Sequence, residues 1–206
     1  MSQTRLGILV AGGLALCGLV AFLLLGSHGT KAAQANRPPA SHPLDARSFT
    51  AAVPAGWTVA ARAAGGARGY HLSSTGARIN PLGIGPKGTI GITVTESGPG
   101  VLAHGRVRGR RAGSYSAPAL LPAVIGTPGR AVSVKRVAAP APRRLAGRPA
   151  AEEAFTYAYR GRKLMQVDVL AKHGGRLFVV ELDAEPALAT RSEAALQAIF
   201  GSWRWR

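Results

Sequence analysis

The twenty residues from Leu6 to Leu25, LGILVAGGLALCGLVAFLLL, carry no charge and no strongly polar group. A helix of this length, rising 1.5 Å per residue, spans a bilayer hydrocarbon core of about 30 Å. We therefore expect residues 1–26 to form a transmembrane anchor or a signal segment. The apolar part of a cleaved signal peptide is normally about 7 to 15 residues long, which favours the anchor. A cleaved form stays open, because Ala33-Gln34-Ala35 has the small-x-small pattern.

The anchor sets the expected location of the rest of the chain. An N-terminal apolar segment is normally read by the export machinery, so we expect the short tail with Arg5 to be cytoplasmic and the remainder extracytoplasmic. The protein is then a single-pass protein of the cell membrane, or a secreted one if the segment is cut. Cys17, the only cysteine, lies within the apolar run, so the exported part has no disulfide.

The remaining residues divide into a linker and one domain. Residues 27–47 are polar, hold three prolines and show no apolar period, which is typical of an extended linker. Residues 48–206 have the length of one ordinary domain and contain no repeat of fixed period.

Three runs in the C-terminal third alternate apolar and polar residues with period two, which predicts β-strands. Short turns at 160–162 and 172–175 separate the runs, as in antiparallel hairpins. The sequence therefore predicts a three-stranded meander. Its alternating apolar residues are Phe155, Tyr157 and Tyr159, then Met165, Val167 and Val169, then Phe178, Val180 and Leu182.

After the meander the apolar period becomes that of a helix. Leu196, Ile199, Phe200 and Trp203 follow the i, i+3, i+4, i+7 rule, and residues 190–193, TRSE, have the form of a capping box. Upstream, the stretches TIGITVTE, AVSVKRV, SFTAAVP and GWTVAA predict further strands. Between Gly98 and Gly129 periodicity is lost, and we expect a long surface excursion. The fold class that follows is α+β, with helices packed on an antiparallel sheet.

No motif of catalysis or cofactor binding stands out. The stretch Gly83–Gly88 fits G-x-G-x-x-G but precedes a strand instead of a helix, so a tight turn at Pro86-Lys87-Gly88 explains it better. The histidines lack metal-ligand spacing, and G-x-S-x-G is absent. We expect the carboxylates of the strands to face outward, and we assign no catalytic, cofactor or metal residue and no enzymatic activity. A hydrolase would instead have a deep pocket with shifted pKa values. The candidate carboxylates are Glu152, Glu153, Asp168, Glu181, Asp183 and Glu185.

Positive charge is concentrated in one part of the chain, whose formal net charge is +17. From Arg47 to Arg148 there are fifteen lysines and arginines against one acid. Within this part, GRVRGRRAG places four arginines in six positions, and these are our candidate residues for binding an anion or a partner: Arg106, Arg108, Arg110 and Arg111. Such a patch attracts nucleic acid, anionic lipid or a wall polymer. The expected extracytoplasmic location and the scarcity of nearby rings argue against nucleic acid.

The order of elements resembles the PsbP/DcrB-like superfamily. The resemblance rests on FTAAVPAGWTV, from Phe49 to Val59, and AIFGSWRW, from Ala198 to Trp205, which enclose a variable middle and a C-terminal meander. It implies an α/β sandwich and a scaffold for interactions, as in an accessory subunit of the oxygen-evolving complex and in adaptor-type lipoproteins. It supplies no site residues. Two departures are the membrane span in place of a lipidated cysteine and the lack of a clear helix before the sheet core.

The sequence thus predicts a membrane-anchored extracytoplasmic domain that binds another envelope component, as an adaptor or accessory protein, without catalysis. The alternative is a basic domain that binds anionic lipid or cell-wall polymer through the arginine-rich loop.

Overall fold

The computed structural model describes residues 40–64, 66–80, 82–124 and 132–206. The expected anchor from Leu6 to Leu25 and most of the expected linker lie outside the described residues. Within the described ranges, no helix is both long and apolar enough to cross a membrane.

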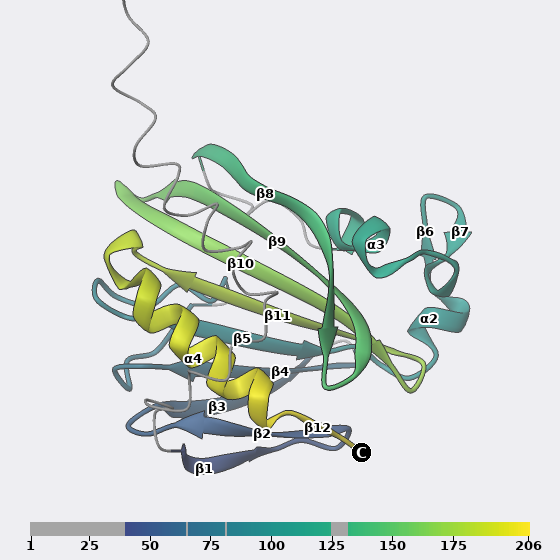
Figure 1. The fold of residues 1–206 in the computed structure, drawn as a ribbon, viewed down its shortest axis with the longest axis horizontal. Helices are drawn as coiled ribbons and strands as arrows, with labels where there is room; N and C mark the ends of the chain where they lie inside the picture. The colour runs from purple at the N-terminus through teal and green to yellow at the C-terminus, as the bar shows by residue number, and fades with distance from the viewer. Residues whose placement is uncertain (1–39, 65, 81, 125–131) are drawn as a thin grey trace, which may run out of the picture. The chain divides into compact units, whose positions relative to one another are not determined.

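A seven-stranded antiparallel sheet organises the domain (Figure 1). Its central strands are the predicted meander, and the pairing of the three strands confirms that prediction. The four upstream stretches that we expected to be strands also form strands: β3, β5 and β8 in this sheet and β2 (Phe49–Pro54) in a second one. In sheet order the strands are β3 (Thr58–Ala64), β4 (Ala67–Ser73), β5 (Gly91–Glu96), β11 (Arg176–Ala184), β10 (Arg162–His173), β9 (Arg148–Tyr159) and β8 (Val132–Leu145).

The register of the meander is set by two-residue turns. Arg160 and Gly161 join β9 to β10 with φ values of 49° and 74°, and the residues on either side, Tyr159 and Arg162, are paired. Positive φ at both central positions is the geometry of a type I′ turn, whose twist matches that of the strands it joins. Because side chains alternate between the faces, this register decides which side chains stand together.

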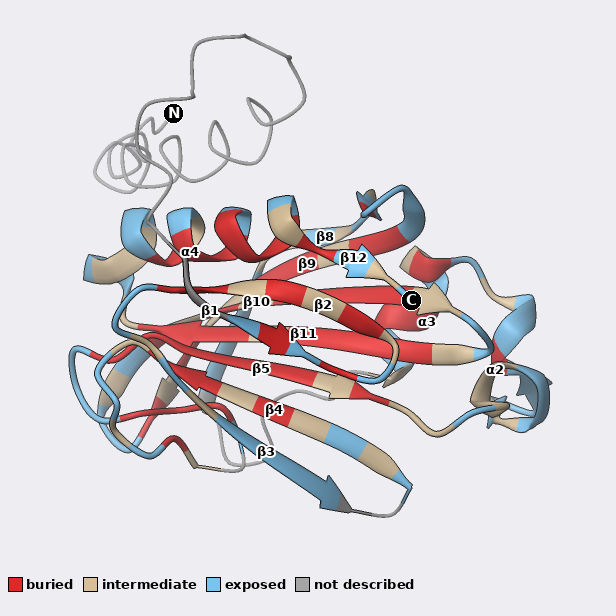
Figure 2. Ribbon diagram, turned by 90° about the horizontal axis from the view of Figure 1, so that it is seen from below, coloured by how far each residue is buried: buried red, intermediate tan, exposed pale blue. Residues whose placement is uncertain are grey.

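One face of the large sheet is covered by a second, smaller sheet and by the C-terminal helix α4 (Ala189–Ser202). The small sheet contains β1 (Ala40–Asp45), β2 (Phe49–Pro54) and β12 (Arg204–Trp205). The Phe49 and Trp203 rings stack here, with centroids 4.0 Å apart, and both side chains are fully buried. Figure 2 shows the buried positions of α4 turned toward the strands. Strand β1 lies within the range that we expected to be linker.

The start and end of α4 differ from the expectation. Leu188 stands at the N-cap and no side chain caps the helix, so the capping box predicted over residues 190–193 is wrong. A 3₁₀ turn, Pro186–Leu188, runs directly into the helix and moves its start upstream, which leaves Thr190 and Glu193 inside it. Trp203 follows the last helical residue, yet it still fills the core.

The other face of the sheet is covered in part by the segment expected to be a surface excursion. This segment holds the short helices α2 (Val101–His104) and α3 (Ala117–Val124). Leu120 and Leu121 of α3 are fully buried against Leu170 and Val179 of the sheet. The expectation was wrong here, because a two-turn helix that contains prolines shows too little periodicity to be recognised. The helix α3 is stabilised by its packing on the sheet and not by the helix propensity of its own residues.

Candidate functional site

The four candidate arginines lie together on one hairpin. Strand β6 (Arg106–Val107) pairs with β7 (Arg110–Arg111), and Arg108 and Gly109 form the turn with φ values of 48° and 80°. All four guanidinium-bearing residues are exposed. The hairpin lies beside α2 and α3, beyond the end of the large sheet (Figure 1). The fold therefore gathers the arginines on an exposed loop.

The base of the hairpin is fixed to the domain. Val107 packs against the buried cluster of α3, and the Tyr115 hydroxyl donates a hydrogen bond to the Val107 carbonyl at 2.9 Å. The Ala112 amide donates to the Gly105 carbonyl at 2.8 Å and closes the segment. The Lys172 ammonium of β10 donates to the Tyr115 carbonyl. Because its base is anchored in this way, the hairpin keeps a defined place at the surface.

The charge of the hairpin is not compensated within the described part of the chain. All nine acidic residues lie in the described ranges, and none of the ion pairs formed there involves a hairpin arginine. One guanidinium nitrogen of Arg106, Nη1, donates to the Gly109 carbonyl at 2.9 Å, which orients the side chain without neutralising it. The hairpin thus presents four unpaired positive charges to solvent.

The carboxylates of the meander are arranged differently from the expectation. Glu153, Asp168 and Glu181 stand directly opposite one another across β9, β10 and β11, on the face that α3 covers, and Asp183 stands in the next row. Asp168 has no exposed surface, and Glu153 and Asp183 are 1% and 3% exposed. The prediction that these carboxylates face outward into solvent was therefore wrong. The face is covered, and like charges placed opposite one another are unfavourable.

Hydrogen bonds and shifted pKa values accompany this burial. The Gln166 amide nitrogen donates to both carboxyl oxygens of Asp168 at 2.8 and 2.9 Å, and the Tyr157 hydroxyl donates to Asp183 at 2.5 Å. Burial raises the pKa of Asp168 to about 8 and that of Asp183 to about 7. Burial also raises the pKa of Glu181 and Glu153. At neutral pH the row therefore holds protons that exposed carboxyl groups lose.

Carboxyl groups that titrate near pH 7 are what general acid–base catalysis requires, but such a group must also come within hydrogen-bond distance of a substrate. Asp168 presents no atom to solvent. The row could have been found from the sequence, because the two-residue turns at Arg160-Gly161 and Gly174-Gly175 fix the register that places Glu153, Asp168 and Glu181 opposite one another. Glu153, Asp168 and Asp183 are buried, whereas Glu181 is half-buried.

The histidines and glycines of the described ranges add no site. His71 shares a hydrogen bond of 3.2 Å with Thr93, and the His173 ring stacks on Trp205 at 4.6 Å. No group of three His, Cys, Asp or Glu residues in the described ranges could hold a metal ion. The turn predicted at Pro86-Lys87-Gly88 is confirmed, because the Thr89 amide donates to the Pro86 carbonyl at 3.1 Å and Gly88 has a φ of 79°.

Comparison with known proteins identifies the fold. The sequence matches no protein-family model, and no curated protein is significantly similar to it. The solution structure of cyanobacterial PsbP (CyanoP) from Synechocystis sp. PCC 6803 superposes with a TM-score of 0.56 and 10% identity, over 86% of this chain and 98% of that one. LpqN of Mycobacterium tuberculosis, described as involved in cell envelope biogenesis, gives 0.46 and 16% over 80% and 89%. The chain has a PsbP-like fold, which confirms the resemblance seen in its sequence at the level of the fold.

Proposed function

We propose that this PsbP-like domain is an accessory interaction domain of the bacterial cell envelope, without catalytic activity, tethered through Leu6 to Leu25. Its partner is an envelope component that presents negative charge: anionic lipid, a wall polymer or the acidic face of an envelope protein. The observation that carries the proposal is the β6–β7 hairpin, on which four exposed arginines have no ion-pair partner in the described chain.

The expected strength of the contact follows from its charge. A basic residue close to an anionic bilayer gains about 1 kcal/mol, so the hairpin gains about 4 kcal/mol, or roughly a thousandfold in affinity. Salt screens this attraction beyond a Debye length of about 10 Å at 0.1 M ionic strength. A tether in the same membrane raises the local concentration of the partner, so a weak contact suffices.

Binding of the full-length protein to vesicles tests the proposal. The protein is reconstituted in zwitterionic nanodiscs, and its cosedimentation with phosphatidylglycerol vesicles or with purified wall polymer is measured between 20 and 300 mM salt. We expect binding that weakens steeply with salt and falls at least tenfold when the four hairpin arginines are replaced by glutamine. If the hairpin instead crosslinks to an envelope protein, and this crosslinking does not weaken with salt, the partner is that protein and not lipid or wall polymer.

A matched control removes the same charge elsewhere. The exposed arginines Arg68, Arg144, Arg148 and Arg191 lie outside the hairpin and are replaced by glutamine in a second variant. We expect this variant to bind almost as the native protein does. Equal losses in the two variants would assign binding to net charge, and an unaffected hairpin variant would refute the proposed contact.

A further inference from the structure

A pocket of about 470 Å³ lies at the end of the domain that carries the turn between β9 and β10. This is the size range of small-molecule sites. Four arginines line it together with buried apolar residues. The arginines are Arg62, Arg78, Arg160 and Arg162, and the apolar lining includes Ile84 and Tyr159.

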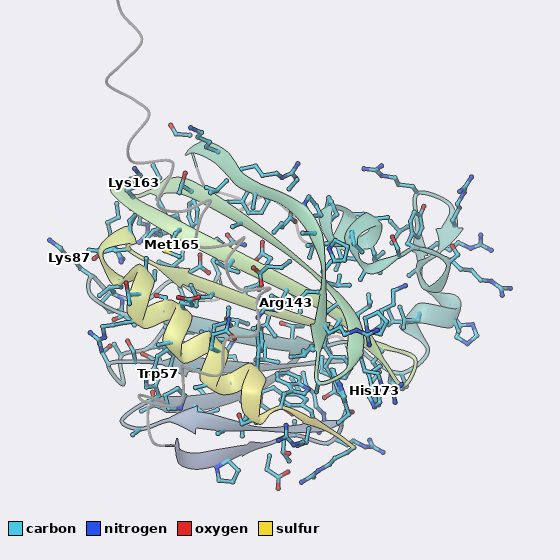
Figure 3. All side chains as sticks on the ribbon, viewed as in Figure 1. Trp57, Lys87, Arg143, Lys163, Met165 and His173 are labelled. Carbon is cyan, nitrogen blue, oxygen red and sulfur yellow. The ribbon has the colours of Figure 1, made fainter. Side chains whose placement is uncertain are left out.

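The arginines come from separate parts of the sequence. Arg62 belongs to the edge strand β3, Arg78 to the loop between β4 and β5, and Arg160 and Arg162 to the β9–β10 hairpin. In Figure 3, Lys87 and Lys163 lie at the same end of the domain; they are the sequence neighbours of two lining residues. Positive charge is therefore concentrated around this pocket by the fold.

Arg162 is a fixed part of the pocket wall. Its Nε donates to the Glu185 carboxylate at 3.1 Å, its Nη1 to the Gly85 carbonyl at 2.7 Å and its Nη2 to the Pro86 carbonyl at 3.3 Å. These bonds join the β9–β10 hairpin to the loop that carries Gly85 and Pro86. The Glu185 carboxylate also neutralises the charge of Arg162.

The other three arginines have no such partner. Every acidic residue of the chain lies in the described ranges, and none forms an ion pair there with Arg62, Arg78 or Arg160. The Arg160 guanidinium lies 5.4 Å from the centroid of the Tyr159 ring, a cation–π contact that holds it at the rim. Burial, and after it the Arg62 charge, lower the pKa of His71, in keeping with a positive potential on this side of the sheet. Three cations around one concavity repel one another, and a bound anion relieves that repulsion.

Part of the pocket wall is apolar. Ile84 and Tyr159 are 5% and 9% exposed and belong to one buried cluster with Tyr157 and Leu164. A small anion that stays hydrated on all sides makes no contact with these apolar residues. A ligand with an anionic group and an apolar body contacts both parts of the pocket, because guanidinium groups donate bidentate hydrogen bonds to phosphate or carboxylate.

We propose that this pocket binds a small amphipathic anion, whose phosphate or carboxylate group pairs with Arg62, Arg78 and Arg160 and whose apolar body packs on Ile84 and Tyr159. This site is separate from the β6–β7 hairpin and takes a single small molecule instead of a charged surface.

Titration calorimetry on the full-length protein in zwitterionic nanodiscs tests the proposal, with empty nanodiscs as the blank. The probes are 1-naphthyl phosphate, 1-naphthoate, inorganic phosphate and uncharged 1-naphthol. We expect 1-naphthyl phosphate or 1-naphthoate to bind at one site per chain, and the stronger of the two identifies the anionic group. Inorganic phosphate and 1-naphthol bind at least tenfold more weakly, since each lacks one half of the recognition. If inorganic phosphate binds as tightly as 1-naphthyl phosphate, the apolar residues do not contribute to binding and the proposal is overturned.

Variants locate the binding. Arg78→Gln and Arg160→Gln remove exposed side chains that no ion pair holds, so both variants are expected to fold, and a thermal melt checks this. We expect each to weaken binding of the naphthyl probe about tenfold or more, the typical loss for a hydrogen bond to a charged group. Arg191→Gln on α4 and the hairpin variant with four glutamines should bind the probe normally. The proposal is overturned if the native protein does not bind the probe, or if Arg78→Gln and Arg160→Gln bind it as the native protein does. Neither result bears on the binding of the β6–β7 hairpin to vesicles, which is a separate measurement.

Discussion

Replacing Asp168 by asparagine is expected to stabilise the domain above neutral pH. Asp168 is fully buried between Glu153 and Glu181, and burial raises its pKa from the ordinary 3.8 to about 8. Below about pH 3 the carboxyl group is protonated in both the folded and the unfolded chain, so its full contribution to stability is present there. As the pH rises toward 8, the unfolded chain releases this proton first, and the free energy of unfolding falls.

The magnitude follows from the pKa. A difference of about four pKa units, at 1.36 kcal/mol per unit, corresponds to about 6 kcal/mol in total, of which about 5 kcal/mol is lost between pH 4 and pH 8. This is the ceiling, and it is comparable with the 5–15 kcal/mol that holds an ordinary domain folded. Asparagine has nearly the same shape, has no charge to bury and keeps an oxygen for the hydrogen bond from Gln166.

Urea unfolding of the full-length protein in mild detergent, followed by tryptophan fluorescence at pH 4 to 8, provides the measurement. We expect the native protein to lose stability as the pH rises, and Asp168→Asn to be several kcal/mol more stable than it at pH 8 but within about 1 kcal/mol of it at pH 4. Asp45→Asn is the control, because Asp45 is exposed and its ion pair with Arg206 should contribute less than about 1 kcal/mol. A native protein that becomes more stable from pH 5 to 8, or an Asp168→Asn protein that is weaker at pH 8, would refute the reasoning.

Two further predictions concern the core and the location of the domain. Trp203→Ala removes a fully buried ring that stacks on Phe49, so it should lower the free energy of unfolding by about 3–5 kcal/mol in the same urea assay; a loss below 1 kcal/mol would contradict the packing. Arg108→Cys places a thiol at the exposed hairpin turn, while the only native cysteine lies in the apolar run. A membrane-impermeant maleimide should label it in intact spheroplasts, and labelling only after lysis would invert the proposed topology.

The central strands were predictable because their signals are local. Alternation over residues 155–182 and two-residue turns are read within a few positions, and together they fix both the strands and their register. Strands β4 and β12, which the sequence did not predict, are harder to recognise. In β4, ARGYHLS offers only two buried apolar residues, Tyr70 and Leu72, and β12 contains two residues whose pairing with β2 crosses almost the whole domain. Such elements are stabilised by distant neighbours and not by their own pattern.

The candidate arginines illustrate the same division. The spacing of Arg106, Arg108, Arg110 and Arg111 was visible in the sequence, but their hairpin was not, because β6 and β7 have two residues each and lack an apolar alternation. Likewise, the alternation placed Asp168 on the face away from the α4 core, and only the packing of the second face made that position a buried one.

The sequence by itself determined the antiparallel meander, the apolar face of the last helix, the concentration of positive charge and the expectation of an anchor from Leu6 to Leu25. Each depends on residues close together along the chain. The tertiary structure decided that Glu153 and Asp168 of the carboxylate row are buried, and that Arg62, Arg78 and Arg160 lie around one pocket. These arrangements depend on which loops cover a face of the sheet and which distant strands pair. Both are determined by the packing of the whole domain.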